Sequence, residues 1–232
     1  SVRGIASMND GNHYCQLNAR GIIESSYSTG EETRVIVDAE ALYLEDSTLI
    51  KINSYHFNTN ETQVLISSNT EAIYRHSSKS DFYIFDLASH SLTPLSTNGK
   101  QSLATFSPDG TKVAFVRENN LFITDLQKNT EKQITHDGLA ESIINGSTDW
   151  VYEEEFSFTK AFYWSPQGEY LAFYKFDESR VKEYELTYYG KLYPQHEKYK
   201  YPKAGEDNSL VSIHTYSLTS GETKSMDIGN EK

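Results

Sequence analysis

A short motif that occurs more than once constrains the fold of this chain more than any other feature. Phe106-Ser-Pro-Asp-Gly-Thr-Lys-Val-Ala-Phe115 is repeated as Trp164-Ser-Pro-Gln-Gly-Glu-Tyr-Leu-Ala-Phe173, and a fainter copy covers Phe57–Ile66. Each copy has the pattern of a strand end, a polar turn and a second, apolar strand. The repetition predicts one structural unit that is used several times along the chain.

Two further strands complete each unit. Candidate third strands lie at Phe82–Leu87, Leu121–Leu126 and Ser212–Leu218, and each precedes a polar turn and a short last strand. The opening residues fit the same plan, with candidate strands at Gly4–Met8, His13–Leu17, Gly21–Ser26 and Thr33–Val37. Four antiparallel strands repeated about every 50 residues are typical of β-propeller blades.

We therefore predict an all-β fold, a partial β-propeller with about four four-stranded blades. The blades are expected at residues 1–41, 42–96, 97–136 and 161–232. A β-sandwich is the alternative, but its strands would not repeat a turn motif in register. Propellers commonly close with about four to eight blades, so we interpret the sequence as a piece of a larger propeller.

Three inserts lengthen the spacing between the repeated elements. They fall at about residues 67–81, 136–160 and 184–208. The first contains Tyr74-Arg75-His76, the second contains Asp149–Phe156, and the third contains the tyrosine-rich arm Tyr188–Gly205. Long insertions in a compact repeat usually carry function, so we expect the functional residues in these three segments.

The second insert contains the acidic run Glu153–Glu155, flanked by aromatic residues. Adjacent side chains of a strand point to opposite faces, whereas in a helical turn they lie about 100° apart, so that two can meet at one ligand. Thr148 and Asp149 are candidate N-caps just upstream. We predict a short helical insert around residues 149–156. A solvated acidic helix start is the alternative, and the aromatic flanks argue against it.

Composition and missing motifs exclude several classes of function. The chain has 21 Lys+Arg against 33 Asp+Glu, a formal net charge of −12, which argues against a nucleic-acid partner. No apolar run approaches the roughly 20 residues that span a bilayer. The histidines and Cys15 lack metal-ligand spacing, so we predict no metal and no cofactor. Without Gly-x-Ser-x-Gly or a phosphate-binding loop, no catalytic residue is predicted in this segment.

Three segments resemble the N-terminal propeller of the dipeptidyl peptidase IV family, a branch of the prolyl oligopeptidases. They are Asp149–Phe156 with Tyr163–Ala172, Tyr74–Ser77 with Tyr83–Leu87, and Tyr201–Gly205. The resemblance runs over essentially the whole chain. It implies the first half of an eight-bladed propeller, joined in the intact protein to a C-terminal α/β-hydrolase domain with a Ser-Asp-His triad. Neither the remaining blades nor the hydrolase domain is expected in this sequence.

The resemblance also implies roles for individual residues. Glu154 and Glu155 match the glutamates that bind the free N-terminal ammonium of a peptide substrate, and Arg75 matches the arginine that contacts a substrate carbonyl. The implied function is a serine dipeptidyl peptidase that releases Xaa-Pro or Xaa-Ala dipeptides, and this segment alone should be inactive. The arm Tyr188–Gly205 is implied in homodimerisation. We expect a periplasmic or extracellular location, with the intact protein either free or attached to a membrane.

Two geometric expectations follow. Inserts from different blades can point at one central space, so Arg75 should lie within salt-bridge or one-water distance of Glu154 or Glu155. Glu153 should matter less for the ligand, because a residue about 100° away on the turn cannot also face the ammonium. The alternative function, a non-catalytic propeller that binds protein partners, would leave the coincidence of Arg75 and the glutamates in separate inserts unexplained.

Overall fold

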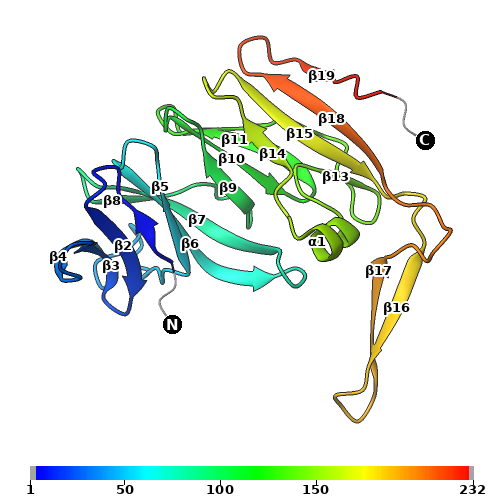
Figure 1. Cartoon of the computed structure of the whole chain (residues 1–232), viewed down its shortest axis with the longest axis horizontal. Helices are drawn as coiled ribbons and strands as arrows, with labels where there is room; N and C mark the ends of the chain where they lie inside the picture. The colour runs from blue at the N-terminus through cyan, green and yellow to red at the C-terminus, as the bar shows by residue number, and fades with distance from the viewer. Residues whose placement is uncertain (1–3, 230–232) are drawn as a thin grey trace.

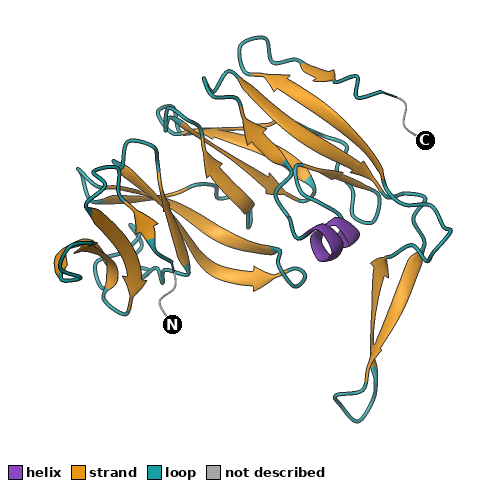
Figure 2. Ribbon diagram, in the orientation of Figure 1, coloured by secondary structure: helices purple, strands orange, loops and turns teal. Residues whose placement is uncertain are grey.

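The computed structural model describes residues 4–229, which form antiparallel sheets and one short helix (Figure 1, Figure 2). Four of the sheets follow one another along the chain, and a separate two-stranded arm projects away from them (Figure 1). This arrangement confirms the predicted all-β partial propeller with a short helical insert. The predicted first and fourth blades, 1–41 and 161–232, extend at their outer ends beyond the described residues.

The first three blades are four-stranded sheets whose strands pair in chain order. Blade one contains β1 (Ala6–Ser7), β2 (His13–Asn18), β3 (Gly21–Ser26) and β4 (Glu32–Asp38). Blade two contains β5 (Ser54–Phe57), β6 (Gln63–Ala72), β7 (Ser78–Asp86) and β8 (Ser91–Pro94). Blade three contains β9 (Ser102–Phe106), β10 (Lys112–Arg117), β11 (Asn120–Asp125) and β12 (Thr130–Gln133).

The repeated sequence motif is the turn between the first and second strands of blades two, three and four. The side chain of the residue after the first strand accepts a hydrogen bond from a backbone N–H five residues later, and these residues are Asn58, Ser107 and Ser165. Gly110 and Gly168 both have φ of +71°, a left-handed conformation that glycine adopts at low cost. In the fainter copy Glu61 takes this position with φ of +54°. The motif is therefore repeated because the same turn is repeated.

The fourth blade differs from the prediction, because its sheet has five strands. These are β13 (Ile143–Asn145), β14 (Phe162–Trp164), β15 (Tyr170–Asp177), β18 (Leu210–Ser217) and β19 (Thr223–Ser225). The extra strand β13 comes from the second insert. The extra strand forms because β14 is shorter than β15. Strand β14 pairs only with residues 171–173 of β15 and leaves the rest of that edge of β15 unpaired. There β13 pairs with Lys175–Asp177 and satisfies the exposed backbone groups.

The first insert is a continuation of blade two and does not form a separate loop. The strands β6 and β7 run on past the sheet, Ala72 pairs with Ser78, and only Ile73–Ser77 remains as the turn. The hairpin reaches across to helix α1 (Trp150–Phe156) of the second insert (Figure 1). The third insert forms the arm, a hairpin of β16 (Glu183–Tyr188) and β17 (Gln195–Lys200).

The apolar core lies in layers between neighbouring blades. One cluster joins blades one and two, a second joins blades two and three, and a third joins blades three and four. Phe115 is fully buried in the second of these layers and stacks on Phe122, with 5.5 Å between ring centroids. Blade position is therefore fixed by packing between sheets. No helix within residues 4–229 is long and apolar enough to cross a membrane.

Phe115→Ala should lower the free energy of unfolding by about 3–5 kcal/mol, because it leaves a cavity between blades two and three. Tyr170, which is 48% exposed on blade four, provides the matched control, and Tyr170→Ala should cost less than about 1 kcal/mol. Chemical denaturation followed by fluorescence measures both. Equal losses for the two variants would mean that the layer between the blades does not carry the stability.

Candidate functional site

Helix α1 is short, and its sequence determines where it begins and ends. The Asp149 carboxylate is the N-cap and accepts a hydrogen bond from the Tyr152 N–H at 2.9 Å. Ser157 ends the helix in a left-handed conformation, with φ of +57°. The Tyr152 ring packs edge-on against the buried Phe176 of blade four, with 4.9 Å between centroids. The cap and this contact fix the helix, so the three glutamates have defined directions.

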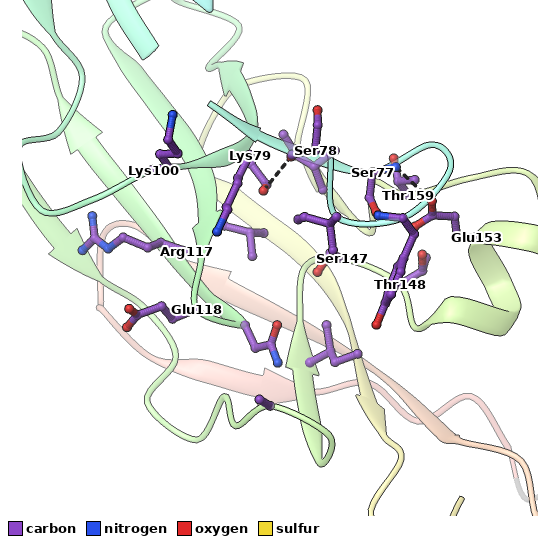
Figure 3. Close-up of a pocket in the computed structure, with 18 of the residues that line it drawn as sticks. Ser77, Ser78, Lys79, Lys100, Arg117, Glu118, Ser147, Thr148, Glu153 and Thr159 are labelled. Carbon is purple, nitrogen blue, oxygen red and sulfur yellow. Dashed lines mark hydrogen bonds between the residues drawn. The ribbon is translucent and has the colours of Figure 1, made fainter. Parts of the chain in front are cut away.

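The first glutamate of the run, Glu153, points inward and is 1% exposed. Its Oε1 accepts hydrogen bonds from the backbone N–H groups of His76 and Ser77, at 2.6 and 2.9 Å. Figure 3 shows Glu153 beside Ser77. Burying a carboxylate is costly unless hydrogen bonds replace its water, and these two bonds supply that replacement. Glu153 therefore fixes the tip of the β6–β7 hairpin to the helix.

The fixed hairpin tip presents Arg75 to the second glutamate. The Arg75 Nε donates to Glu154 Oε1 at 3.0 Å, although the two residues are 79 positions apart in the sequence. The predicted proximity of Arg75 to the glutamates is confirmed. The Arg75 side chain is 72% exposed and the Glu154 side chain is 18% exposed. The pair thus lies at the surface, with the guanidinium on the solvent side.

The third glutamate, Glu155, is exposed at the end of the helix. Its carboxylate makes no hydrogen bond or ion pair with the residues that the structure describes, and the terminal amino groups of Arg75 are likewise unused within residues 4–229. The structure thus brings Arg75 and Glu154 together and leaves Glu155 beside them as a free acceptor. Together these groups can bind a ligand that carries both a positive charge and a hydrogen-bond acceptor.

The anchoring contact of Glu153 is a functional feature that the sequence did not reveal. We expected Glu153 to matter least of the three glutamates, and the structure gives it a role in holding the site together. Helical geometry predicts that one residue of the run points inward. Its partners, however, are backbone N–H groups, which every residue except proline carries and which leave no signal in the sequence.

A pocket of about 650 Å³ lies behind the hairpin, between it and blades three and four. One side is lined by the basic residues Lys79, Lys100 and Arg117, and Glu153 lies on the other (Figure 3). Tyr74 also lines the pocket, and burial together with nearby carboxylates raises its pKa to about 12. The wall of the pocket thus continues directly into the hairpin tip that carries Arg75.

Glu178 is a second buried carboxyl group in this wall, and it is 5% exposed. Burial raises its pKa from the ordinary value of 4.5 to about 7. The charges of Glu141 and Asp149 add to this increase, and Lys200 acts in the opposite direction. Its side chain makes no hydrogen bond or ion pair with the described residues. Glu178 therefore keeps its proton to a higher pH than an exposed glutamate does.

The site contains no metal-binding arrangement within residues 4–229, where no three or more His, Cys, Asp or Glu side chains are placed to hold an ion. Cys15, remote from the site in blade one, is fully buried. Burial raises its pKa to about 12, so it is an unreactive thiol. The chemistry available at the site is therefore that of carboxylates, a guanidinium and aromatic rings.

Comparison with known proteins relates this chain to one family. A family model described as "Dipeptidyl peptidase IV (DPP IV) N-terminal region" matches residues 58–232. A dipeptidyl-aminopeptidase B of Aspergillus niger is 35% identical over 216 residues, covering 86% of this chain and 24% of the relative. The dipeptidyl aminopeptidase B of Saccharomyces cerevisiae is 32% identical over 211 residues, covering 88% of this chain and 25% of the relative.

A solved structure extends the similarity to three dimensions. The crystal structure of Porphyromonas gingivalis dipeptidyl peptidase 4 matches with a TM-score of 0.89 and 42% identity, covering 99% of this chain and 33% of that one. The chain therefore spans about a quarter of the length of the two fungal relatives and a third of the bacterial structure. In sequence and in fold it corresponds to one portion of a larger protein.

Glu178 should make stability depend on pH. Its folded pKa, about 7, lies above the ordinary value of 4.5, so the folded state holds a proton that the unfolded state has lost between these pH values. The free energy of unfolding should therefore fall as pH rises from about 4.5 to about 7 and then level off. Glu178→Gln should remove this contribution and raise the thermal midpoint at pH 8 relative to the wild type, with no difference at pH 4.5.

The exposed Glu169 supplies the matched control, and Glu169→Gln should leave the pH profile of the midpoint unchanged. Differential scanning calorimetry between pH 4.5 and 8 measures all three proteins. A Glu178→Gln protein whose profile runs parallel to that of the wild type would contradict the assignment of this dependence to Glu178.

Proposed function

The chain belongs to the dipeptidyl peptidase IV N-terminal region family, and from this membership we propose that it recognises the substrate's amino terminus in a serine-type dipeptidyl peptidase. The reaction is the release of N-terminal dipeptides, Xaa-Pro or Xaa-Ala, by a hydrolase domain of the same protein. The observation that carries the proposal is the Arg75–Glu154 ion pair with the unpaired Glu155 beside it.

The charges of the site suit a peptide α-ammonium. Such a group has a pKa of about 7.7–8.0, so it is largely cationic at neutral pH. Glu154 and Glu155 carry two negative charges and Arg75 one positive charge, which leaves the site one cation short of neutrality. Glu155 is free to accept the ammonium, while Arg75 holds Glu154 in place and offers its remaining N–H groups to a substrate carbonyl.

An anchored ammonium also determines where cleavage occurs. Two extended residues reach about 7 Å at roughly 3.3–3.6 Å each, so the second peptide bond lies at a fixed distance from the glutamates. A nucleophile held at that distance by the hydrolase domain would cut after the second residue and at no other bond. The preference for Pro or Ala at that residue would reside in the hydrolase domain.

The arm supports a proposal about assembly. Its tip presents large side chains to solvent: Tyr189 is 81% exposed, Leu192 is 92% exposed and Tyr193 is 79% exposed. Exposed apolar groups gathered on a projecting hairpin are a feature of protein interfaces. We propose that the arm contacts a second copy of the protein and forms a homodimer. We also propose that the intact protein is located in the periplasm or outside the cell.

Glu154→Gln and Glu155→Gln in the full-length protein should each cost about 2–4 kcal/mol of transition-state stabilisation, because a charged partner of the ammonium is lost. This corresponds to a fall of about 30- to 1,000-fold in kcat/KM for a chromogenic Xaa-Pro substrate with a free amino terminus. Steady-state kinetics against that substrate and its N-acetylated form measure the effect.

Glu45 is an exposed glutamate in the segment between blades one and two, and Glu45→Gln should leave the kinetics unchanged. The wild type should strongly prefer the free amine over the acetylated form, and the Glu154 and Glu155 variants should lose most of that preference. If all variants retain the wild-type preference, the two glutamates do not recognise the ammonium.

Replacing Tyr189, Leu192 and Tyr193 together with serine should convert the dimer to a monomer, because the change removes the apolar contacts of the arm tip and leaves its strands intact. Sedimentation velocity of the full-length protein measures the assembly. Tyr43→Ser, at a 53% exposed position outside the arm, should remain dimeric. A triple variant that sediments as the wild type does would remove the arm tip from the interface.

A further inference from the structure

Aromatic side chains from three separate segments meet where the arm joins the body of the protein. They come from the hairpin tip, from helix α1 and from the arm, and we call them the arm-base cluster: Tyr74, Trp150, Tyr184 on β16, Tyr199 on β17, and Tyr201 just after β17. The cluster lies beside the Arg75–Glu154 pair, because Tyr74 directly precedes Arg75 and Trp150 opens the helix that carries Glu154.

Tyr199, on strand β17 of the arm, is the member that touches both halves of the site. Its ring centroid lies 5.6 Å from that of Tyr74, with the rings close to edge-on, and 5.6 Å from that of Trp150, with the rings tilted by 30°. Both separations are typical of favourable aromatic pairs. One arm residue therefore bridges the segment that positions Arg75 and the segment that positions Glu154.

Two further contacts connect the arm to the helix. The Tyr201 ring lies 5.2 Å from Trp150 and 5.7 Å from Tyr184 on the opposite arm strand. Just after the arm, the Ser209 hydroxyl donates to the carboxylate of Asp149, which is the N-cap of α1. The helix is thus held by the segment that leaves the arm after β17, and a change in the orientation of the arm would be transmitted to it.

The ion pair needs this support because it cannot position itself. Arg75 is 72% exposed, and exposed ion pairs contribute little to stability because water screens them. The hydrogen bonds of Glu153 fix the backbone of the hairpin tip at His76 and Ser77, on one side of Arg75. On the other side, Tyr74 is held through its packing against Tyr199. Arg75 is therefore aligned by a contact on each side of it.

We propose that Tyr199 is a positioning residue for the amine-recognition site. Through Tyr199, the base of the arm keeps Arg75 and Glu154 aligned with each other. The inference rests on the proposed function, since it concerns the same site. It adds that the arm supports substrate recognition in its own chain. This role does not depend on contact between the arm tips of two copies. Loss of the Tyr199 ring should loosen the hairpin tip from the helix and weaken binding of the free amine.

The test compares Tyr199→Ala with Tyr199→Phe in the full-length protein. Phenylalanine keeps the ring and removes only the hydroxyl, which bonds to Glu197 on the arm itself. Hydrogen–deuterium exchange at the His76 and Ser77 amides reports docking of the hairpin tip and needs no activity. Exchange there should accelerate about tenfold in Tyr199→Ala and stay at the wild-type rate in Tyr199→Phe and in Tyr170→Ala.

Kinetics on the free-amine substrate supply the second measurement. Tyr199→Ala should raise KM about tenfold with kcat within about threefold of the wild type, because alignment of a binding site is lost and the reacting groups are unchanged. Tyr199→Phe should restore the wild-type KM, and sedimentation should show both variants in the wild-type assembly state. Unchanged exchange at His76 and Ser77 in Tyr199→Ala, or a KM equal to that of the wild type, would overturn the inference.

The two proposals can fail separately. A full-length protein that cleaves free-amine and acetylated substrates equally well would refute amine recognition whatever the Tyr199 variants do. In that case the exchange rates still decide whether Tyr199 holds the hairpin tip on the helix. A protein that shows the free-amine preference but tolerates Tyr199→Ala in both measurements would refute only the role of Tyr199.

Discussion

The buried carboxylate of Glu153 joins two inserts that belong to different blades. Its two hydrogen bonds to backbone N–H groups of the hairpin tip replace the water that the charge loses on burial. They attach the end of the β6–β7 hairpin, which runs on past its own sheet, to helix α1. Because the acceptor lies on helix α1, formation of the hairpin contact and orientation of the helix occur together. The exposed part of the site depends on this inner contact.

The propeller architecture explains why residues so far apart in sequence can form one site. Each blade packs on its neighbours through an apolar layer, so the blades have fixed positions relative to one another. The hairpin of blade two extends past the end of blade three and reaches helix α1 of the second insert (Figure 1). The space left beneath the hairpin is the pocket lined by blades two, three and four. A site of this kind needs rigid blades, and the layers between them supply that rigidity.

Much of the fold could be predicted, because the turn between the first two strands needs a specific residue at a left-handed position and therefore leaves a repeated pattern. Helix α1 was also predictable from a capping residue, and the Arg75–Glu154 pair from the family resemblance together with the position of the inserts. Strand β13 was not, since its pairing depends on the shortness of β14 and not on its own three residues. The contacts of Glu153 and Tyr199 escaped prediction because they join segments whose proximity only the folded chain establishes.

The three adjacent glutamates of α1 illustrate how one short helix can separate structural and recognition roles. Rotation of about 100° per residue points Glu153 into the protein, Glu154 towards Arg75 and Glu155 into solvent. The buried Glu153 accepts two backbone hydrogen bonds and fixes the hairpin tip, Glu154 is paired with the Arg75 guanidinium, and Glu155 has no partner among the described residues. A cation that arrives at the unpaired Glu155 finds the adjacent Glu154 carboxylate already held by Arg75. Of the three glutamates, only Glu155 then has side-chain freedom left to lose when a ligand binds, because the other two already have partners on the hairpin tip.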